Sequence, residues 1–126
     1  MSRTIMFDKL GGPEVLDVVD TEAGDPADNE VQLAVRAAGL NRAELMFIAG
    51  NYLVQPSFPS RVGVEAAGVV TKVGRAVSAV RESDEVSVFP SIDMNRYGVI
   101  GELANVPTSA LIPKPTSVSF VDAAAF

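Results

Sequence analysis

The chain has 126 residues, a formal net charge of −6 at neutral pH, 48% hydrophobic residues and 21% charged residues. These values are ordinary for one soluble globular domain, and the acidic balance argues against partners that require a basic face, such as nucleic acid or an anionic membrane. No apolar run approaches the roughly 20 residues of a membrane span. Asp8 and Lys9 come too early for a signal peptide, so we expect a cytoplasmic protein.

Two residue types are missing from the sequence: there is no cysteine and no histidine. Their absence removes thiol nucleophiles, disulfides, serine–histidine triads and the ordinary zinc ligand sets. The sequence also carries no GxGxxG or Walker motif, and therefore no phosphate-binding loop of the usual kind. Any chemistry must use carboxylates, hydroxyls, amides, lysine or arginine, or a bound cofactor.

Short β-prone runs follow one another along the chain, separated by residues that favour turns. The clearest alternation of apolar and polar residues lies at 30–39. This spacing predicts a small antiparallel barrel or sandwich. The predicted strands cover 4–7, 14–21, 30–39, 62–73, 84–89 and 99–106.

Residues 41–50 carry the signals of a helix. Asn41 suits the N-cap, Glu44 follows three residues later as in a capping box, and Gly50 suits the C′ position. The two prolines in 51–60 then predict an irregular loop.

The last ten residues, 117–126, predict the start of another helix. Ser119 precedes Asp122 by three residues, and alanines follow. An isolated helix this short is marginal. We therefore expect the chain to be the front part of a longer protein, and the alternative is a short docked terminal helix.

Glu65 is the only carboxylate in RVGVEAAGVVTKVG, residues 61–74. A buried charge costs free energy unless a partner pairs with it. Gly63 and Gly68 flank this residue and predict a bend or a bulge of the strand. From the residues alone, Glu65 caps backbone N–H groups or pairs with an arginine, and a catalytic role is the alternative.

Other candidates for a site also have structural interpretations. Taken alone, Asn41 reads as a helix cap and Tyr52 as a packing aromatic, while Met46 and Phe58 fit either a pocket wall or a core.

The segments EVLDVVD, EVQLAVRAAGLN, AGNY, GVEAAGVV, SDEV and GELANVP follow one another along nearly the whole chain. Taken together, they are similar to the N-terminal GroES-like catalytic domain of the medium-chain dehydrogenase/reductase superfamily, within its zinc-free quinone oxidoreductase branch. The resemblance implies a mainly β fold: a partly open antiparallel β-barrel with a few short helices, spanning 1–126 of a two-domain α/β enzyme whose Rossmann domain is absent from this chain.

Two positions indicate the branch. Asn41 stands where zinc-dependent members have the cysteine of Cys-x-x-Asp, and Val64 stands where they have the histidine of Gly-His-Glu. The four-cysteine structural zinc lobe is missing as well, so the resemblance implies no zinc. Ile48, in place of a frequent arginine, implies a more apolar cleft than in typical members.

The resemblance also implies the site residues. Asn41 and Tyr52 would face the cleft. Asn41 would bind the nicotinamide end of the cofactor or the substrate carbonyl, and Tyr52 would donate to the substrate oxygen. Glu65 would lie at its inner wall, paired across the cleft in the longer protein and short of partners in this chain. Met46 and Phe58 would shape the substrate pocket.

The absence of zinc bears on the reaction. Alcohol oxidation uses zinc as a Lewis acid, whereas a quinone or an α,β-unsaturated carbonyl delocalises the charge that an arriving hydride creates. We expect the longer protein to be a homodimeric enzyme that reduces quinones or α,β-unsaturated carbonyls with NADPH or NADH, the last proton coming from water. We expect this chain alone to bind no cofactor and to lack activity. The alternatives are a non-catalytic GroES-like binding or structural module and an inactive fragment.

Overall fold

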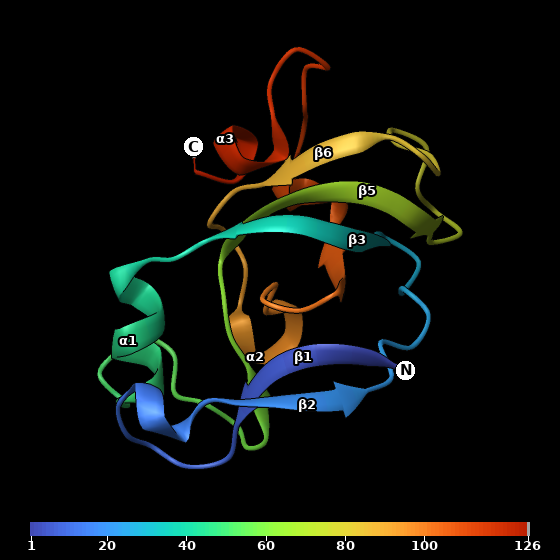
Figure 1. Ribbon diagram of the computed structural model, residues 1–126. Coiled ribbons are helices and arrows are strands. Elements are labelled where there is room, and N and C mark those ends of the chain that lie inside the picture. The colour runs from blue at the N-terminus through green and yellow to red at the C-terminus, as the bar shows by residue number, and fades with distance from the viewer. Residues whose placement is uncertain (126) are drawn as a thin grey trace.

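The computed structural model describes residues 1–125, which form two sheets and several short helices (Figure 1). Phe126, the last residue of the predicted terminal helix, lies outside the described residues. In chain order the elements are β1 (Ser2–Phe7), η1 (Pro13–Val15), β2 (Asp17–Thr21), β3 (Glu30–Gly39), α1 (Arg42–Ile48), β4 (Ser60–Arg61), β5 (Glu65–Val73), β6 (Glu85–Val88), α2 (Met94–Tyr97), β7 (Leu103–Pro107), η2 (Thr108–Ala110), β8 (Leu111–Pro113) and α3 (Phe120–Ala124).

The sheets are both antiparallel. One has the strand order β2-β1-β4 and the other the order β7-β3-β5-β6-β8. A bridge between Thr4 and Gly101 lies outside the named strand pairs. In Figure 1 the smaller sheet lies below the larger one, α1 stands at one side, and α3 lies against the larger sheet. The expected mainly β fold is confirmed, without a closed barrel among residues 1–125.

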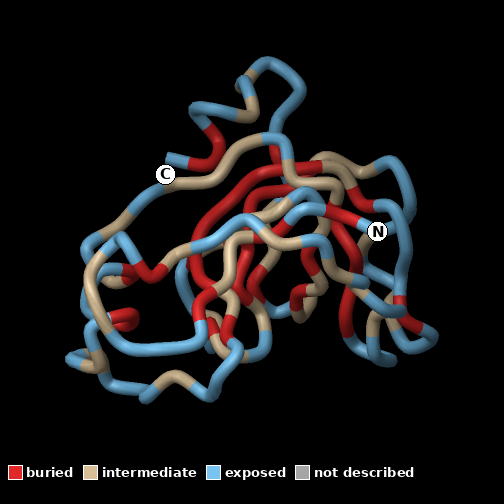
Figure 2. Tube along the Cα trace, turned by 60° about the horizontal axis from the view of Figure 1, so that its bottom comes forward, coloured by how far each residue is buried: buried red, intermediate tan, exposed pale blue. Residues whose placement is uncertain are grey.

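The core consists of two main clusters. Figure 2 shows long buried stretches in the interior of the fold and exposed stretches at its periphery. Apolar side chains of the larger sheet form the first cluster. The second joins the smaller sheet to α1, and Phe7 packs edge-on against Phe47 with ring centroids 5.6 Å apart. Among the described residues, no helix has the length and apolar character needed to cross a membrane.

The predicted strand at 30–39 is confirmed as β3, which pairs with β5 and β7. Burial does not follow the expected alternation, since residues 30–33 are all buried. The run 14–21 is only partly a strand: Pro13–Val15 forms a 3-10 turn and β2 begins at Asp17. The run 99–106 is also shorter than predicted, since β7 begins at Leu103. The short elements β4, α2 and β8 were not predicted.

The glycines near Glu65 act differently from each other. Gly63 has a φ of +107° and precedes β5, which begins only at Glu65, so the predicted bend lies before the strand. Gly68 lies within β5, and a Cβ there would overlap the carbonyl oxygen of Ala34. The register of β3 and β5 shifts at two places, between Gln32 and Leu33 and between Val35 and Ala37, and the second shift lies beside Gly68.

The terminal helix begins where the sequence predicts. The Ser119 Oγ accepts a hydrogen bond from the Asp122 amide at 3.1 Å. The helix is docked on the larger sheet, where the Ser87 hydroxyl donates to the Ala123 carbonyl at 3.1 Å.

Candidate functional site

The candidate site is built at the junction between β3 and α1. Asn41 is the N-cap of α1, and together with Glu44 it forms the predicted capping box. The Glu44 Oε1 accepts a hydrogen bond from the Asn41 backbone amide at 2.6 Å. Gly50 ends the helix with a φ of +78°, and the amide of Asn51 donates to the Met46 carbonyl at 2.8 Å. Both ends of α1 are therefore held by local hydrogen bonds.

Glu65 reaches the same junction from β5. Its Oε1 accepts a hydrogen bond from the Asn41 side-chain Nδ2 at 3.0 Å. The resemblance implied that Glu65 would be short of hydrogen-bond partners in this chain. The bond from Asn41 shows that this is wrong for Oε1. Gly39 faces Glu65 in the register of β3 and β5, and a Cβ at Gly39 would overlap the carboxylate. A glycine at this position leaves the space that the Glu65 side chain occupies.

An apolar pocket of about 470 Å³ opens beside Asn41 and Glu44. Those two residues are its polar members. The rest are aliphatic side chains from β1, from α1 and from the segments just before β2, α1, β5 and β7. Leu40 and Leu45 are exposed at its rim, with 83% and 52% of their surface accessible. The pocket is lined by Ile5, Leu16, Leu40, Asn41, Glu44, Leu45, Val62 and Ile100.

Glu44 is the most unusual acid of this site. It is only 7% exposed, and its Oε2 is buried without a hydrogen-bond partner among residues 1–125. Burial raises the pKa of the Glu44 carboxyl above its ordinary value, and the negative charge of Glu65 raises it further, while hydrogen bonds from backbone amides act in the opposite direction. The sequence identified Glu44 only as a helix cap, because a capping glutamate and a pocket acid look alike in sequence.

The other predicted site residues lie apart from this pocket. Tyr52 packs edge-on against Phe47, with ring centroids 6.3 Å apart, and Phe58 packs against Phe7 at 5.8 Å. Met46 lies on α1 and is 39% exposed. The structure thus brings Asn41 and Glu65 together, and places none of these three side chains in the pocket lining.

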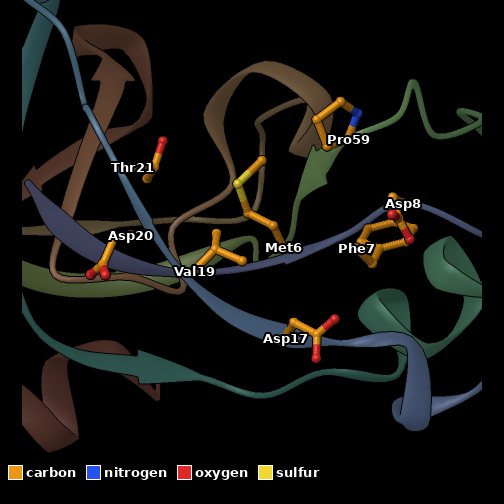
Figure 3. A pocket seen from close by; sticks show the side chains of 8 residues that line it. All are labelled: Met6, Phe7, Asp8, Asp17, Val19, Asp20, Thr21 and Pro59. Atoms are coloured by element: carbon orange, nitrogen blue, oxygen red, sulfur yellow. The ribbon is translucent and has the colours of Figure 1, made fainter.

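A second pocket, of about 350 Å³, lies beside β1 and β2 (Figure 3). Asp8, Asp17 and Asp20 line it, but their carboxylates lie apart along the strands in Figure 3 and do not converge on one point. In the part of the chain that the structure describes, no group of three acidic or other metal-ligating side chains is placed to hold a metal ion.

Residues 27–116 match the family of the alcohol dehydrogenase GroES-like domain. The chain belongs to this family, in the quinone oxidoreductase branch of the medium-chain dehydrogenase/reductase superfamily. This confirms the resemblance found in the sequence.

Several relatives place the chain within that branch. It is 38% identical to quinone oxidoreductase 1 of Escherichia coli over 125 residues, covering 99% of this chain and 37% of the relative. The structure of Escherichia coli quinone oxidoreductase complexed with NADPH superposes with a TM-score of 0.86 at 36% identity, covering 100% of this chain and 37% of that one. The quinone oxidoreductase of Pseudomonas syringae gives a TM-score of 0.91 at 35% identity, covering 98% and 37%. The chain spans just over a third of the length of these relatives.

Proposed function

We propose that this chain is the catalytic domain of a longer oxidoreductase that reduces quinones or α,β-unsaturated carbonyls by hydride transfer from NADPH, without zinc. The observation that carries the proposal is the apolar pocket in which Asn41 and Glu44 are the polar lining residues among residues 1–125. The similarity to quinone oxidoreductases supports it.

The pocket chemistry suits such a substrate. An apolar pocket of about 470 Å³ accommodates a flat, uncharged conjugated ring. Orientation and modest hydrogen bonding are sufficient for hydride addition to such a ring, because its conjugated system already spreads the developing charge. The pocket lining offers the Asn41 side-chain amide as a hydrogen-bond donor, and Glu65 orients this amide through the hydrogen bond of 3.0 Å.

The residues of this chain fit one end of a nicotinamide cofactor. A neutral ring carrying a carboxamide matches an apolar surface with an amide at its edge, as at Asn41 and Leu40. The sequence offers no glycine-rich loop for the cofactor pyrophosphate, so we assign that part to another segment of the longer protein. When bound, the cofactor supplies the hydride.

The remaining roles are also part of the proposal. Asn41 holds the nicotinamide end or the substrate carbonyl, Tyr52 donates to the substrate oxygen from the loop after α1, and Met46 and Phe58 contact the substrate when the longer protein is assembled. NADPH in preference to NADH, a homodimer and a cytoplasmic location belong to the proposal as well.

The test measures turnover of 1,4-benzoquinone with NADPH by the longer protein, in the presence of EDTA. We expect turnover to survive the chelator and ethanol oxidation to be negligible. Because loss of one preorganised donor costs on the order of 10²-fold, Asn41→Leu should lower kcat/KM by about that factor. Asn29→Ala, at an exposed loop position, is the matched control and should leave kcat/KM unchanged.

Two outcomes would contradict the proposal. One is zinc-dependent oxidation of ethanol by the longer protein. The other is an Asn41→Leu variant that reduces benzoquinone as fast as the unaltered protein. A separate titration of the 126-residue chain with NADPH, followed by cofactor fluorescence, should show no saturable binding.

A further inference from the structure

We propose that the carboxyl group of Glu44 donates the proton that the substrate carbonyl oxygen takes up in the apolar pocket, and that Asn41 and Glu65 hold it in place for this role. The inference rests on the proposed function and changes one part of it, because the sequence indicated water as the proton source. It assigns to Glu44 a role beyond that of a helix cap.

The two carboxyl oxygens of Glu44 have different surroundings. Oε1 is fixed by the Asn41 backbone amide at 2.6 Å. Oε2 is buried and has no hydrogen-bond partner among residues 1–125, and the side chain lines a pocket whose other walls are aliphatic. A buried polar atom without a partner costs free energy. Oε2 has almost no accessible surface, so a ligand carbonyl oxygen in the pocket would supply that partner only after a small shift of the Glu44 carboxyl toward the pocket, with Oε2 carrying a proton.

Asn41 joins two acids through its two amide groups. Its backbone N–H binds Glu44, and its side-chain Nδ2 binds Glu65 at 3.0 Å. Burial is the main reason that the pKa of the Glu44 carboxyl is raised. Ionised Glu65 adds a smaller effect in the same direction, because two carboxylates that share a site disfavour each other's charge.

The other charged groups near Glu44 have defined positions. Glu14 lies on η1, which packs against α1, and its carboxylate is engaged by the Gly12 amide at 3.0 Å. Arg42 lies on the same helix as Glu44 and is exposed. Glu65 is the charged residue whose repulsion acts on the Glu44 carboxyl.

The proposed step balances. The conjugated carbon of the substrate accepts a hydride from the nicotinamide cofactor, so the substrate is reduced by two electrons and the cofactor is oxidised. The carbonyl π electrons move to the oxygen, which takes the proton as the O–H bond of Glu44 breaks. Glu44 is left as a carboxylate, and it regains a proton from water when the product leaves.

The first test uses the 126-residue chain and needs no activity. Unfolding by urea is measured at pH 4 and pH 8 for the unaltered chain and for Glu44→Gln, in which glutamine can still serve the capping box. A raised pKa means that folded Glu44 keeps its proton while the unfolded chain loses it above about 4.5. Glu44 therefore lowers the stability of the unaltered chain as the pH rises through this window. Glu44→Gln should remove that fall. The urea midpoint of this variant, relative to that of the unaltered chain, should therefore be higher at pH 8 than at pH 4.

The matched control is Glu82→Gln, because Glu82 is exposed in a turn before β6. Its urea midpoint should keep a constant difference from that of the unaltered chain. Glu65→Gln should reduce the fall in stability with rising pH, because it removes the negative charge beside Glu44. An equal response of Glu44→Gln and Glu82→Gln to pH would overturn the inference.

The second test uses the longer protein with 1,4-benzoquinone and NADPH. We expect kcat of the unaltered enzyme to fall at alkaline pH as Glu44 loses its proton, and Glu44→Gln to turn over about 10²-fold more slowly without that alkaline fall. Glu65→Gln should move the alkaline fall of kcat to lower pH. If Glu44→Gln keeps both the rate and the profile, the proton role is refuted while the reductase function stands. If the unaltered enzyme does not reduce the quinone at all, the proposed function fails.

Discussion

At the scale of single residues, the pairing of Gly39 with Glu65 determines how the site is built. Glu65 is only 8% exposed, and its carboxylate fills the space that a side chain at Gly39 would occupy. The same carboxylate orients Asn41 through its Nδ2. A small residue in β3 is thus a precondition for the hydrogen bond that positions the amide of the pocket.

Gly39→Ala should therefore destabilise the chain and disturb Asn41. Overpacking of a buried position costs about 1–3 kcal/mol, and we expect a loss of this size in the free energy of unfolding measured with urea. The decisive comparison is a double-mutant cycle with Glu65→Ala, which removes the overlapping side chain. Gly39→Ala should cost much less in that background. An equal cost in both backgrounds would show that Glu65 is not what Gly39 accommodates.

At the scale of elements, Lys114 attaches α3 to the larger sheet. Its ammonium lies 2.9 Å from Glu85 Oε1, donates to the carbonyls of Pro115 and Val118, and sits 4.8 Å from the centre of the Phe120 ring. The lysine side chain is only 3% exposed. A helix of five residues has little stability of its own, so these contacts, together with apolar packing, hold it in place.

Lys114→Met should release α3 more than it disturbs the rest of the chain. A hydrogen bond to a charged group contributes about 1.5–3 kcal/mol, so we expect a loss of about 2 kcal/mol in the free energy of unfolding and faster amide exchange at Ala123. The matched control is Lys72→Met, which removes an exposed ion pair with Asp25 at 3.0 Å. Such pairs contribute about 0–1 kcal/mol. Equal losses for the two variants would count against the role of Lys114.

At the scale of the whole molecule, the segment before β7 joins the two sheets. The Glu102 amide donates to the Arg3 carbonyl of β1 at 2.9 Å, and the Glu102 carbonyl accepts from the Val35 amide of β3 at 2.9 Å. Ile100 also donates to the Val62 carbonyl at 3.0 Å. One short segment therefore provides backbone hydrogen bonds to both sheets, next to the apolar pocket that Ile100 helps to line.

Gly98→Ala should weaken this junction. A Cβ at Gly98 would lie 2.5 Å from the backbone nitrogen of Val62, and a backbone atom cannot yield as a flexible side chain does. We expect the urea midpoint to fall by the equivalent of about 1–3 kcal/mol. At Gly101 the nearest atoms are the end of the Arg61 side chain and the Thr4 hydroxyl, both at 3.1 Å, and no backbone atom lies as close, so Gly101→Ala should cost less. The reverse order would contradict this account of the junction.

Local patterns in the sequence predicted the elements whose signals lie within a few residues. The strand at 30–39, the capping box of Asn41 and Glu44, and the cap at Ser119 are all confirmed. They could be predicted because strand periodicity and helix capping depend on neighbours two to four residues apart. The short strand β4 carries no such signal, since two residues form it through pairing with β1.

The sequence by itself determined the mainly β class, the helix between 41 and 50, the lack of cysteine and histidine, and, by resemblance, the family of the chain. Only the tertiary structure decided that Glu65 binds Asn41, that Gly39 makes room for it, and that Glu44 keeps a buried oxygen without a partner beside an apolar pocket. The physical reason is distance along the chain. Asn41 and Glu65 are 24 residues apart, and the pairing of β3 with β5, which forms across that separation, is what brings them together.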